Sequence, residues 1–230
     1  MSLRINSWKK VATYTLWIIL AALFLTFFLR VAIWEKGYYE EKEGSERAVA
    51  AVVPDEREVL DETKPTEEEV AEYKVPLGTP RYINIPFLNI HAKVVTVGLK
   101  KSGELETPNN IFDAGWYTDS GLPGQNKNIV IDGHSGGPTE YNGVFRHIGE
   151  LMTNETIEIV IAAEPEDIVY RYHVVDNNTI KLDEATDFMR KNIFSNSAQT
   201  GALYLISCTG EWSNVQNTYL SRQFVKAERI

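Results

Sequence analysis

The chain contains one cysteine among its 230 residues, so an internal disulfide is excluded. Basic residues are also in the minority, with 23 Lys and Arg against 32 Asp and Glu and a formal net charge of -9. Binding of nucleic-acid phosphates needs clustered Lys and Arg, so this balance excludes a general nucleic-acid binder. Cys208 is then either a small buried apolar side chain or a reactive thiol.

Several cofactor motifs are absent as well. The sequence has no Cys-x-x-Cys, no His-Glu-x-x-His, no glycine-rich phosphate loop and no acidic spacing typical of a calcium loop. We therefore expect no metal or organic cofactor, and the sequence leaves open whether calcium modulates the protein.

A long uncharged run is present near the beginning of the chain. Residues 11–29 contain no charged residue, and a helix of this length matches the bilayer core of about 30 Å. Three basic residues lie within residues 1–10, which the positive-inside rule places in the cytoplasm. We expect a transmembrane anchor over 11–34. The alternative is a cleaved signal peptide, whose apolar core would be shorter and followed by small residues.

The following segment is strongly acidic. Residues 35–74 carry fourteen acidic residues against six basic ones and have little apolar periodicity. Such a segment buries too little surface to offset the entropy of ordering it. We expect 35–78 to be a flexible acidic stalk and 79–230 to be the folded domain.

From Pro80 onward, short runs rich in Val, Ile and Tyr alternate with turn residues. This pattern is typical of a mainly β domain, either a closed barrel or a sandwich. Only Gly143–Leu151 and Asp183–Lys191 have apolar residues at helical spacing, so we expect two short helices there.

Cys208 comes at the end of the apolar run ALYLISC and is followed by the polar stretch TGEWSNVQNTY. The pattern predicts a strand that ends at the thiol, at the rim of the domain. A lone cysteine in such a run is also a common packing residue. A partner decides between the two interpretations, because a thiol attacks amides usefully as a thiolate, which a nearby His and a cation favour.

His134 and Arg222 are the candidate partners. His134 follows the buried-looking run NIVIDG, and Arg222 begins the final predicted strand, so all three side chains could meet at one rim. A guanidinium there can donate hydrogen bonds to an oxyanion, although a surface salt bridge is the alternative. Asp132 shares a strand face with His134, and it either orients His134 or caps the turn.

This set of residues resembles the sortases over roughly 79–230. The resemblance is carried by Gly-His at one strand end, by the run LYLISCT, by an Arg in the following strand, and by the stretch RYINIPFLNIHAKVVTVGL. The family pattern Thr-Leu-x-Thr-Cys is replaced here by Tyr204-Leu205-Ile206-Ser207-Cys208, which leaves the subclass open.

The resemblance implies an eight-stranded β-barrel with short helices, and a cysteine transpeptidase in which Cys208 is the nucleophile, His134 the proton shuttle and Arg222 the oxyanion stabiliser. Its substrates would be secreted proteins with a sorting signal of the Leu-Pro-x-Thr-Gly kind. The acceptor would be an amine of a cell-wall precursor or of a pilin lysine, and the catalytic domain would lie outside the membrane.

We expect the loops 181–200 and 209–219 to select the substrate. Candidate substrate-binding residues are Ser207, Trp212, Phe188, Ile193 and Phe194. The alternative is that the apolar side chains of the first loop seal the end of the barrel. Two other functions remain open at this stage: a hydrolytic extracytoplasmic cysteine protease, and a catalytically silent, membrane-anchored β domain that binds a partner.

Overall fold

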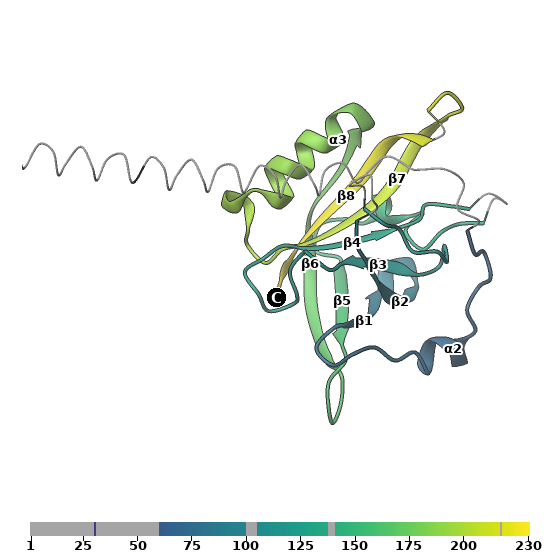
Figure 1. Ribbon diagram of the computed structural model, residues 1–230, viewed down its shortest axis with the longest axis vertical. Coiled ribbons are helices and arrows are strands. Elements are labelled where there is room, and N and C mark those ends of the chain that lie inside the picture. The colour runs from purple at the N-terminus through teal and green to yellow at the C-terminus, as the bar shows by residue number, and fades with distance from the viewer. Residues whose placement is uncertain (1–29, 31–59, 100–104, 138–140, 217) are drawn as a thin grey trace, which may run out of the picture. The chain divides into compact units, whose positions relative to one another are not determined.

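The computed structural model describes residues 30, 60–99, 105–137, 141–216 and 218–230 (Figure 1). The chain divides into two units, 1–44 and 45–230, and the account below concerns the second. Most of the predicted anchor and the stalk up to residue 59 lie outside the described residues. No helix among the residues described is both long enough and apolar enough to cross a membrane.

Within the described part of the chain, eight strands close into a barrel, as the resemblance implied. The order around the barrel is β1-β2-β3-β4-β7-β8-β6-β5. The strands are β1 (Pro80–Ile85), β2 (Ile90–Val97), β3 (Ala114–Tyr117), β4 (Ile129–Gly133), β5 (Thr156–Ile161), β6 (Ile168–Lys181), β7 (Leu203–Ser213) and β8 (Thr218–Arg229). Two neighbouring pairs, β2 with β3 and β4 with β7, are parallel. The parallel β4 and β7 therefore direct their carboxyl ends to the same rim.

Alternation along the strands separates two apolar layers. Inside the barrel, an inner cluster includes Ile131 of β4, Leu205 of β7 and Val225 of β8. On the other face of the same strands, an outer cluster is built around Val130 and Phe224. The outer cluster is covered by α3 (Leu182–Met189) and the π-helical turn η4 (Arg190–Phe194), which connect β6 to β7. Figure 1 shows α3 alongside the long hairpin of β7 and β8.

The helix prediction is right for one segment and wrong for the other. The predicted helix Asp183–Lys191 is observed as α3, continued by η4. Gly143–Leu151 forms turns and only one 3-10 turn, η3 (Ile148–Glu150). Its apolar side chains have the spacing of a helix because they enter the inner cluster from successive turns. Two further 3-10 turns are η2 (Pro86–Leu88) and η5 (Asn196–Ala198).

Residues 60–79 pack against the barrel, which corrects the expectation of a flexible stalk for this part of the chain. The Tyr82 hydroxyl donates to the Val70 carbonyl at 2.5 Å, and Arg81 Nε donates to the Tyr73 carbonyl at 2.6 Å. The helix α2 (Glu67–Ala71) begins with Thr66, whose side chain and that of Glu69 form a capping box. Polar side chains of β1 hold this segment, so apolar periodicity did not reveal it.

Candidate active site

The strand registers pair Cys208 with Arg222 and bring the end of β4, which His134 follows, to the same rim. Cys208 of β7 lies directly opposite Arg222 of the antiparallel β8. On the other side of β7, Asp132 of the parallel β4 pairs with Ile206. The last pair of this ladder precedes His134 and Cys208 by two residues each, so both follow it toward the same rim. Cross-strand neighbours have Cβ atoms about 5 Å apart, so the thiol of Cys208 and the guanidinium of Arg222 share one small area.

This area lies on the outer face of the barrel. Cys208 is two residues beyond Ile206, and Arg222 is two residues before Phe224, which are both members of the outer cluster. Because strand side chains alternate between faces, Cys208 and Arg222 continue the outer face toward the rim. The site therefore begins where the apolar outer layer beneath α3 and η4 ends.

His134 is held at both its ring and its backbone. Its Nε2 donates to the carbonyl oxygen of Pro108 at 2.8 Å, since a carbonyl only accepts. The His134 carbonyl accepts from the Phe145 N–H at 2.9 Å. Gly133 permits this turn, because a Cβ there would lie 2.6 Å from the Phe145 ring. The imidazole thus has a fixed direction before any substrate arrives.

The Arg222 side chain is only 2% exposed and is held by several acceptors. Its Nη1 donates to the carbonyl oxygens of Tyr219 at 2.8 Å and Ser221 at 3.0 Å, and its Nη2 donates to Thr218 Oγ1 at 3.1 Å. Burial lowers the pKa of the guanidinium and the nearby Cys208 opposes this change. Guanidinium groups nevertheless remain charged, so a fixed cation faces the thiol.

Cys208 is partly exposed, which a nucleophile requires. Burial of its surroundings raises the pKa of the thiol, the Arg222 cation lowers it, and Asp132 raises it further. The thiol is therefore mainly protonated near neutral pH, and it needs a base to become a nucleophile.

The structure places Ser207 away from the site. Its side chain is buried on the opposite strand face from Cys208, where its Oγ donates to the Gly133 carbonyl at 2.9 Å. A direct contact between Ser207 and a substrate on the outer face is therefore not supported. This hydrogen bond joins β7 to Gly133 of β4, the residue that precedes His134.

The aromatic candidates of the 181–200 connection pack on the barrel. Phe188 lies against Phe224 with ring centroids 4.7 Å apart, Phe194 meets Tyr117 edge-on at 6.3 Å, and Ile193 is completely buried. These contacts place the apolar side chains on the outer face of the barrel, where they cover the outer cluster and do not seal the end of the barrel. Phe188 and Phe194 remain only partly buried beside the site.

Trp212 lies in a strand, where the sequence predicted a loop. β7 continues past Cys208 to Ser213 and β8 already begins at Thr218, with an irregularity in the pairing between Thr209 and Trp212. Trp212 is 47% exposed and packs edge-on against Tyr219 at 5.2 Å. Polar composition suggested a turn here, whereas cross-strand pairing of two long strands provides the regular structure.

Two contacts near His134 were missed by the sequence analysis. Pro108, which accepts from the imidazole, belongs to an irregular segment with no motif. Residues 60–64 border the same region, because Asp61 exchanges backbone hydrogen bonds with Asn109 and Ile111. The side chain of Glu62 lies where a Cβ on Gly137 would stand. Nothing local in the sequence indicates these long-range pairings.

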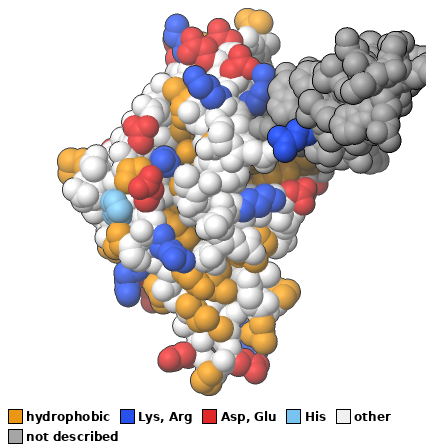
Figure 2. Space-filling view, turned by 90° about the vertical axis from the view of Figure 1, so that its left-hand side faces the viewer, with side chains coloured by type: hydrophobic (Ala, Val, Ile, Leu, Met, Phe, Trp, Pro, Cys, Tyr) orange, Lys and Arg blue, Asp and Glu red, His pale blue; other side chains and the backbone are white. Residues whose placement is uncertain are grey.

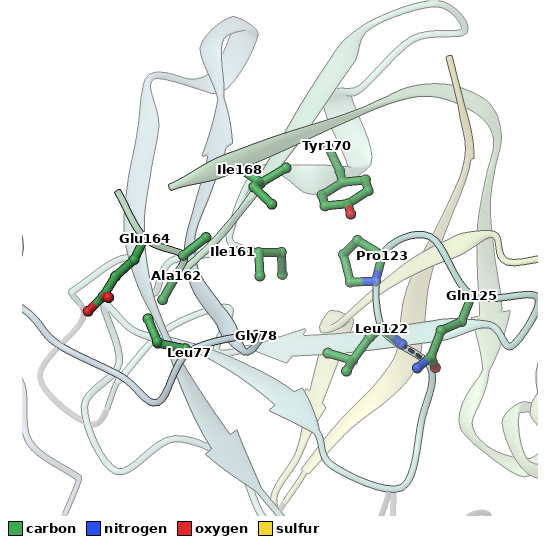
Figure 3. Close-up of a pocket in the computed structure, with 11 residues that line it drawn as sticks. Leu77, Gly78, Leu122, Pro123, Gln125, Ile161, Ala162, Glu164, Ile168 and Tyr170 are labelled. Atoms are coloured by element: carbon green, nitrogen blue, oxygen red, sulfur yellow. Dashed lines mark hydrogen bonds between the residues drawn. The ribbon is translucent and has the colours of Figure 1, made fainter. Parts of the chain in front are cut away.

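An apolar cavity lies away from these residues. It has a volume of 430 Å³ and is lined mainly by apolar side chains, among them Leu77, Leu122, Ile161 and Tyr170 (Figure 3). In the view of Figure 2, hydrophobic side chains gather toward the lower end of the molecule. The connection between β5 and β6 lies at the same end in Figure 1. None of the three candidate residues lines the cavity, so its size does not make it the active site.

Comparison with known proteins gives the family. A model of the sortase domain matches residues 83–230. Solved structures with a similar fold include a lid mutant of sortase A from Corynebacterium diphtheriae, with 21% identity, a TM-score of 0.48 and coverage of 71% of this chain and 76% of that chain. A sortase D5 transpeptidase from Clostridium perfringens has 21% identity and a TM-score of 0.47, and the match covers 72% of this chain and 89% of that one.

A third structure is sortase C from Clostridium perfringens with the C-terminal cell wall sorting motif, at 20% identity and a TM-score of 0.44, covering 67% of this chain and 72% of that chain. A search of curated proteins found no match.

Proposed function

The chain belongs to the sortase family of cysteine transpeptidases, and from this premise we propose that it cleaves a sorting signal in secreted proteins and transfers them to an amine acceptor. The observation that carries the proposal is the pairing of Cys208 with Arg222 across β7 and β8, while His134 directly follows the neighbouring β4. These are the three residue types that thioester-forming transfer at a carbonyl requires.

In the first half of the reaction, Cys208 attacks the carbonyl carbon of the scissile peptide bond. His134 takes the thiol proton and passes it to the leaving amine as the C–N bond breaks. Arg222 and backbone N–H groups stabilise the oxyanion of the tetrahedral intermediate. The product of this half is a thioester between the substrate and Cys208.

In the second half, an acceptor amine attacks the thioester carbonyl. His134 removes a proton from the amine, the C–S bond breaks, and the proton returns to the thiolate of Cys208. A new amide bond joins the substrate to the acceptor and the enzyme is restored. No step needs a metal or organic cofactor, and modulation by calcium is left to experiment.

The identity of substrate and acceptor belongs to the proposal. The signal is of the Leu-Pro-x-Thr-Gly kind, and the acceptor is an amine of a cell-wall precursor or a pilin lysine. Residues 11–34 anchor the enzyme in the cell membrane, with the N-terminus in the cytoplasm and the catalytic domain outside. The apolar run of 11–29 and the basic residues before it support this placement.

Mass spectrometry of the full chain, incubated with a panel of sorting-signal peptides, tests the proposed function. We expect an acyl adduct on Cys208 with at least one peptide, and release of that adduct as a new amide when a primary amine is added. Cys208→Ala should give no adduct and should unfold at nearly the wild-type temperature. Adduct release at a rate independent of the amine would favour the hydrolytic protease, and an unreactive, slowly alkylated thiol would favour the silent binding domain.

A further inference from the structure

The ring of His134 is held by a backbone carbonyl from an irregular stretch of chain. Its Nε2 donates to the Pro108 carbonyl at 2.8 Å, and residues 106–109 belong to no helix or strand. A neutral imidazole carries one proton, whose position decides which of its two nitrogens can accept another. The Pro108 carbonyl selects the tautomer with the proton on Nε2. Its own position must be kept by contacts other than regular secondary structure.

The chain before the barrel supplies such contacts through its backbone. The Asp61 N–H donates to the Asn109 carbonyl at 2.9 Å, and the Ile111 N–H donates to the Asp61 carbonyl at 3.0 Å. These two bonds enclose Asn110, which forms a parallel β-bridge with Asp61. Because Asn109 directly follows Pro108, the first bond fixes the peptide group next to the carbonyl that accepts from the imidazole.

Side chains strengthen the same bridge. The Asn110 Nδ2 donates to Asp61 Oδ2 at 3.0 Å and to the Thr63 carbonyl at 2.8 Å, while its Oδ1 accepts from the Phe112 N–H at 2.9 Å. Asp61 Oδ1 accepts from the Thr63 N–H at 2.8 Å. Hydrogen bonds from Thr63 and Asn110 lower the pKa of Asp61, so this side chain is a carboxylate at neutral pH and only accepts. It thus joins two parts of the chain that are 49 positions apart.

A second route leads from the same stretch of chain to the backbone of the histidine. The Ile111 carbonyl accepts from the Val144 N–H at 2.8 Å, and the next residue, Phe145, donates its N–H to the His134 carbonyl at 2.9 Å. Ile111 is completely buried, so this connection is shielded from water. Residues 108–111 therefore reach His134 at its ring directly and at its backbone through one intervening segment.

We propose, building on the transpeptidase function proposed above, that Asp61 is a positioning residue for the reaction, which holds the Pro108 carbonyl against His134 and keeps the imidazole proton on Nε2. The lone pair that exchanges protons with Cys208 and with the leaving amine is then the one on Nδ1. Asp61 acts through Pro108 and not by contact with the substrate. The segment before the barrel is by this assignment part of the catalytic apparatus.

Steady-state cleavage of a sorting-signal peptide by the full chain is the first measurement. Asp61→Asn keeps the size of the side chain and its backbone hydrogen bonds, but it replaces one acceptor oxygen by an amide donor. We expect kcat to fall about tenfold and KM to stay within about twofold, because a displaced imidazole impairs proton transfer and not peptide binding. Asp61→Ser, which can still accept from the Thr63 N–H, is the second variant if Asp61→Asn does not fold.

Nitrogen-15 NMR of the imidazole rings in the full chain is the second measurement. The two ring nitrogens of a neutral histidine have different chemical shifts in the two tautomers, so the spectrum reports which nitrogen carries the proton. We expect His134 to carry it on Nε2 in the unaltered chain and to populate both tautomers with Asp61→Asn. Loss of one signal in His134→Gln gives the assignment. The other three histidines, His91, His147 and His173, are internal controls.

Two further variants separate positioning from a general loss of structure. Thr66→Ala removes the capping box of α2 in the same part of the chain, so it should lower the unfolding temperature but leave kcat and the tautomer unchanged. Asn110→Asp added to Asp61→Asn exchanges donor and acceptor. This pair should recover part of the lost kcat, since one side-chain hydrogen bond is restored while the bond to the Thr63 carbonyl is lost.

The outcomes distinguish this proposal from the proposed function. An unchanged tautomer in Asp61→Asn, even with a lower kcat, would make Asp61 a structural residue, and a changed tautomer with full kcat would equally overturn its role in the reaction. If Cys208 of the unaltered chain forms acyl adducts in either case, the transpeptidase function stands. If the tautomer depends on Asp61 but no peptide gives an adduct, the effect of Asp61 on His134 stands and the transpeptidase function is wrong.

Discussion

Three groups act on the Cys208 thiol at the scale of single residues. Burial of the thiol disfavours the thiolate, the positive charge of Arg222 favours it, and the negative charge of Asp132 disfavours it. The net result is a raised pKa, so the thiolate is a minor species at neutral pH. In the proposed mechanism, attack by Cys208 therefore requires transfer of the thiol proton to His134.

The pH dependence of Cys208 alkylation should report the raised pKa of the thiol. Cys208 is the only cysteine, so iodoacetamide labelling followed by mass spectrometry reports on it alone. Because the pKa is raised, the thiol stays protonated to higher pH than a free cysteine, and we expect the labelling midpoint above the usual value of about 8.5. The urea-unfolded chain serves as the control with an ordinary midpoint. A midpoint below that of the unfolded chain would contradict the raised pKa.

Arg222→Lys should lower kcat/KM for peptide cleavage by about 100- to 1,000-fold, the cost of one oxyanion donor. Hydrogen bonds from the guanidinium to Tyr219, Ser221 and Thr218 fix its direction, and an ammonium group cannot reproduce that geometry. Steady-state cleavage of a fluorogenic peptide measures the effect, with circular dichroism to verify folding. Activity within a few-fold of wild type would make Arg222 a structural residue.

At this scale, residue types and their order along the chain predicted that Cys208, His134 and Arg222 would meet at one rim, and the structure pairs Cys208 with Arg222. The surroundings of Asp132 were not predictable from the sequence. Its carboxyl group lies against Gly115, whose missing side chain leaves room for it, and near Pro108, and both residues are distant from Asp132 in the sequence. Ser207 was assigned to the substrate because it adjoins Cys208, but neighbours in a strand point to opposite faces.

Among the structural elements, the turn after β4 controls the position of His134. The backbone of Gly143 lies so close to this turn that a Cβ would stand 2.3 Å from the His134 carbonyl oxygen. The Gly143 N–H also donates to the Ser135 carbonyl at 3.2 Å. Two backbone segments in such contact have no flexible side chain that could move aside.

Gly143→Ala should therefore impair the reaction by displacing His134. We expect a loss of kcat/KM of at least about tenfold, since a displacement of about 1 Å can cost far more, and a destabilisation of roughly 1–3 kcal/mol. Gly149→Ala is the matched control, because the nearest atom to its Cβ is the flexible Gln223 side chain at 3.3 Å. Peptide cleavage and chemical denaturation measure the two effects. Similar activity of both variants would show that the turn tolerates displacement.

Sequence periodicity predicted most of the strands but misjudged where β7 and β8 end. The residues between Cys208 and Arg222 are polar, and polar composition is typical of loops, yet the structure pairs Ser213 with Thr218. An antiparallel hairpin satisfies its backbone groups whatever its side chains are, so exposed strands carry little apolar signal. The same reason explains why Arg222 lies inside β8 and not at its start.

At the scale of the whole molecule, the barrel depends on a segment outside its strands. Residues 60–79 are joined to it through Arg81, Tyr82 and Asn110, and the Tyr73 hydroxyl donates to the Val94 carbonyl at 3.0 Å. The folded domain thus begins before residue 79. The acidic composition of this segment suggested a spacer. Its contacts with the barrel are made by individual polar groups, which leave no apolar pattern in the sequence.

Removal of this segment should weaken the fold. A protein comprising residues 80–230 should have a free energy of unfolding roughly 2–4 kcal/mol below that of residues 60–230, given several hydrogen bonds worth about 0.5–1.5 kcal/mol each. Urea denaturation followed by tryptophan fluorescence measures the difference. A spacer with no role in the fold would leave the two proteins equally stable, and that result would restore the stalk interpretation.

The place of β8 in the barrel has a consequence for the order of events during synthesis. This last strand stands between β7 and β6, and it carries Arg222 opposite Cys208. A nascent chain that has emerged only as far as Ser213 already contains the thiol and His134, but it has an open sheet and no cation beside the sulfur. In the proposed mechanism, the oxyanion stabiliser therefore joins the thiol only when β8 closes the barrel.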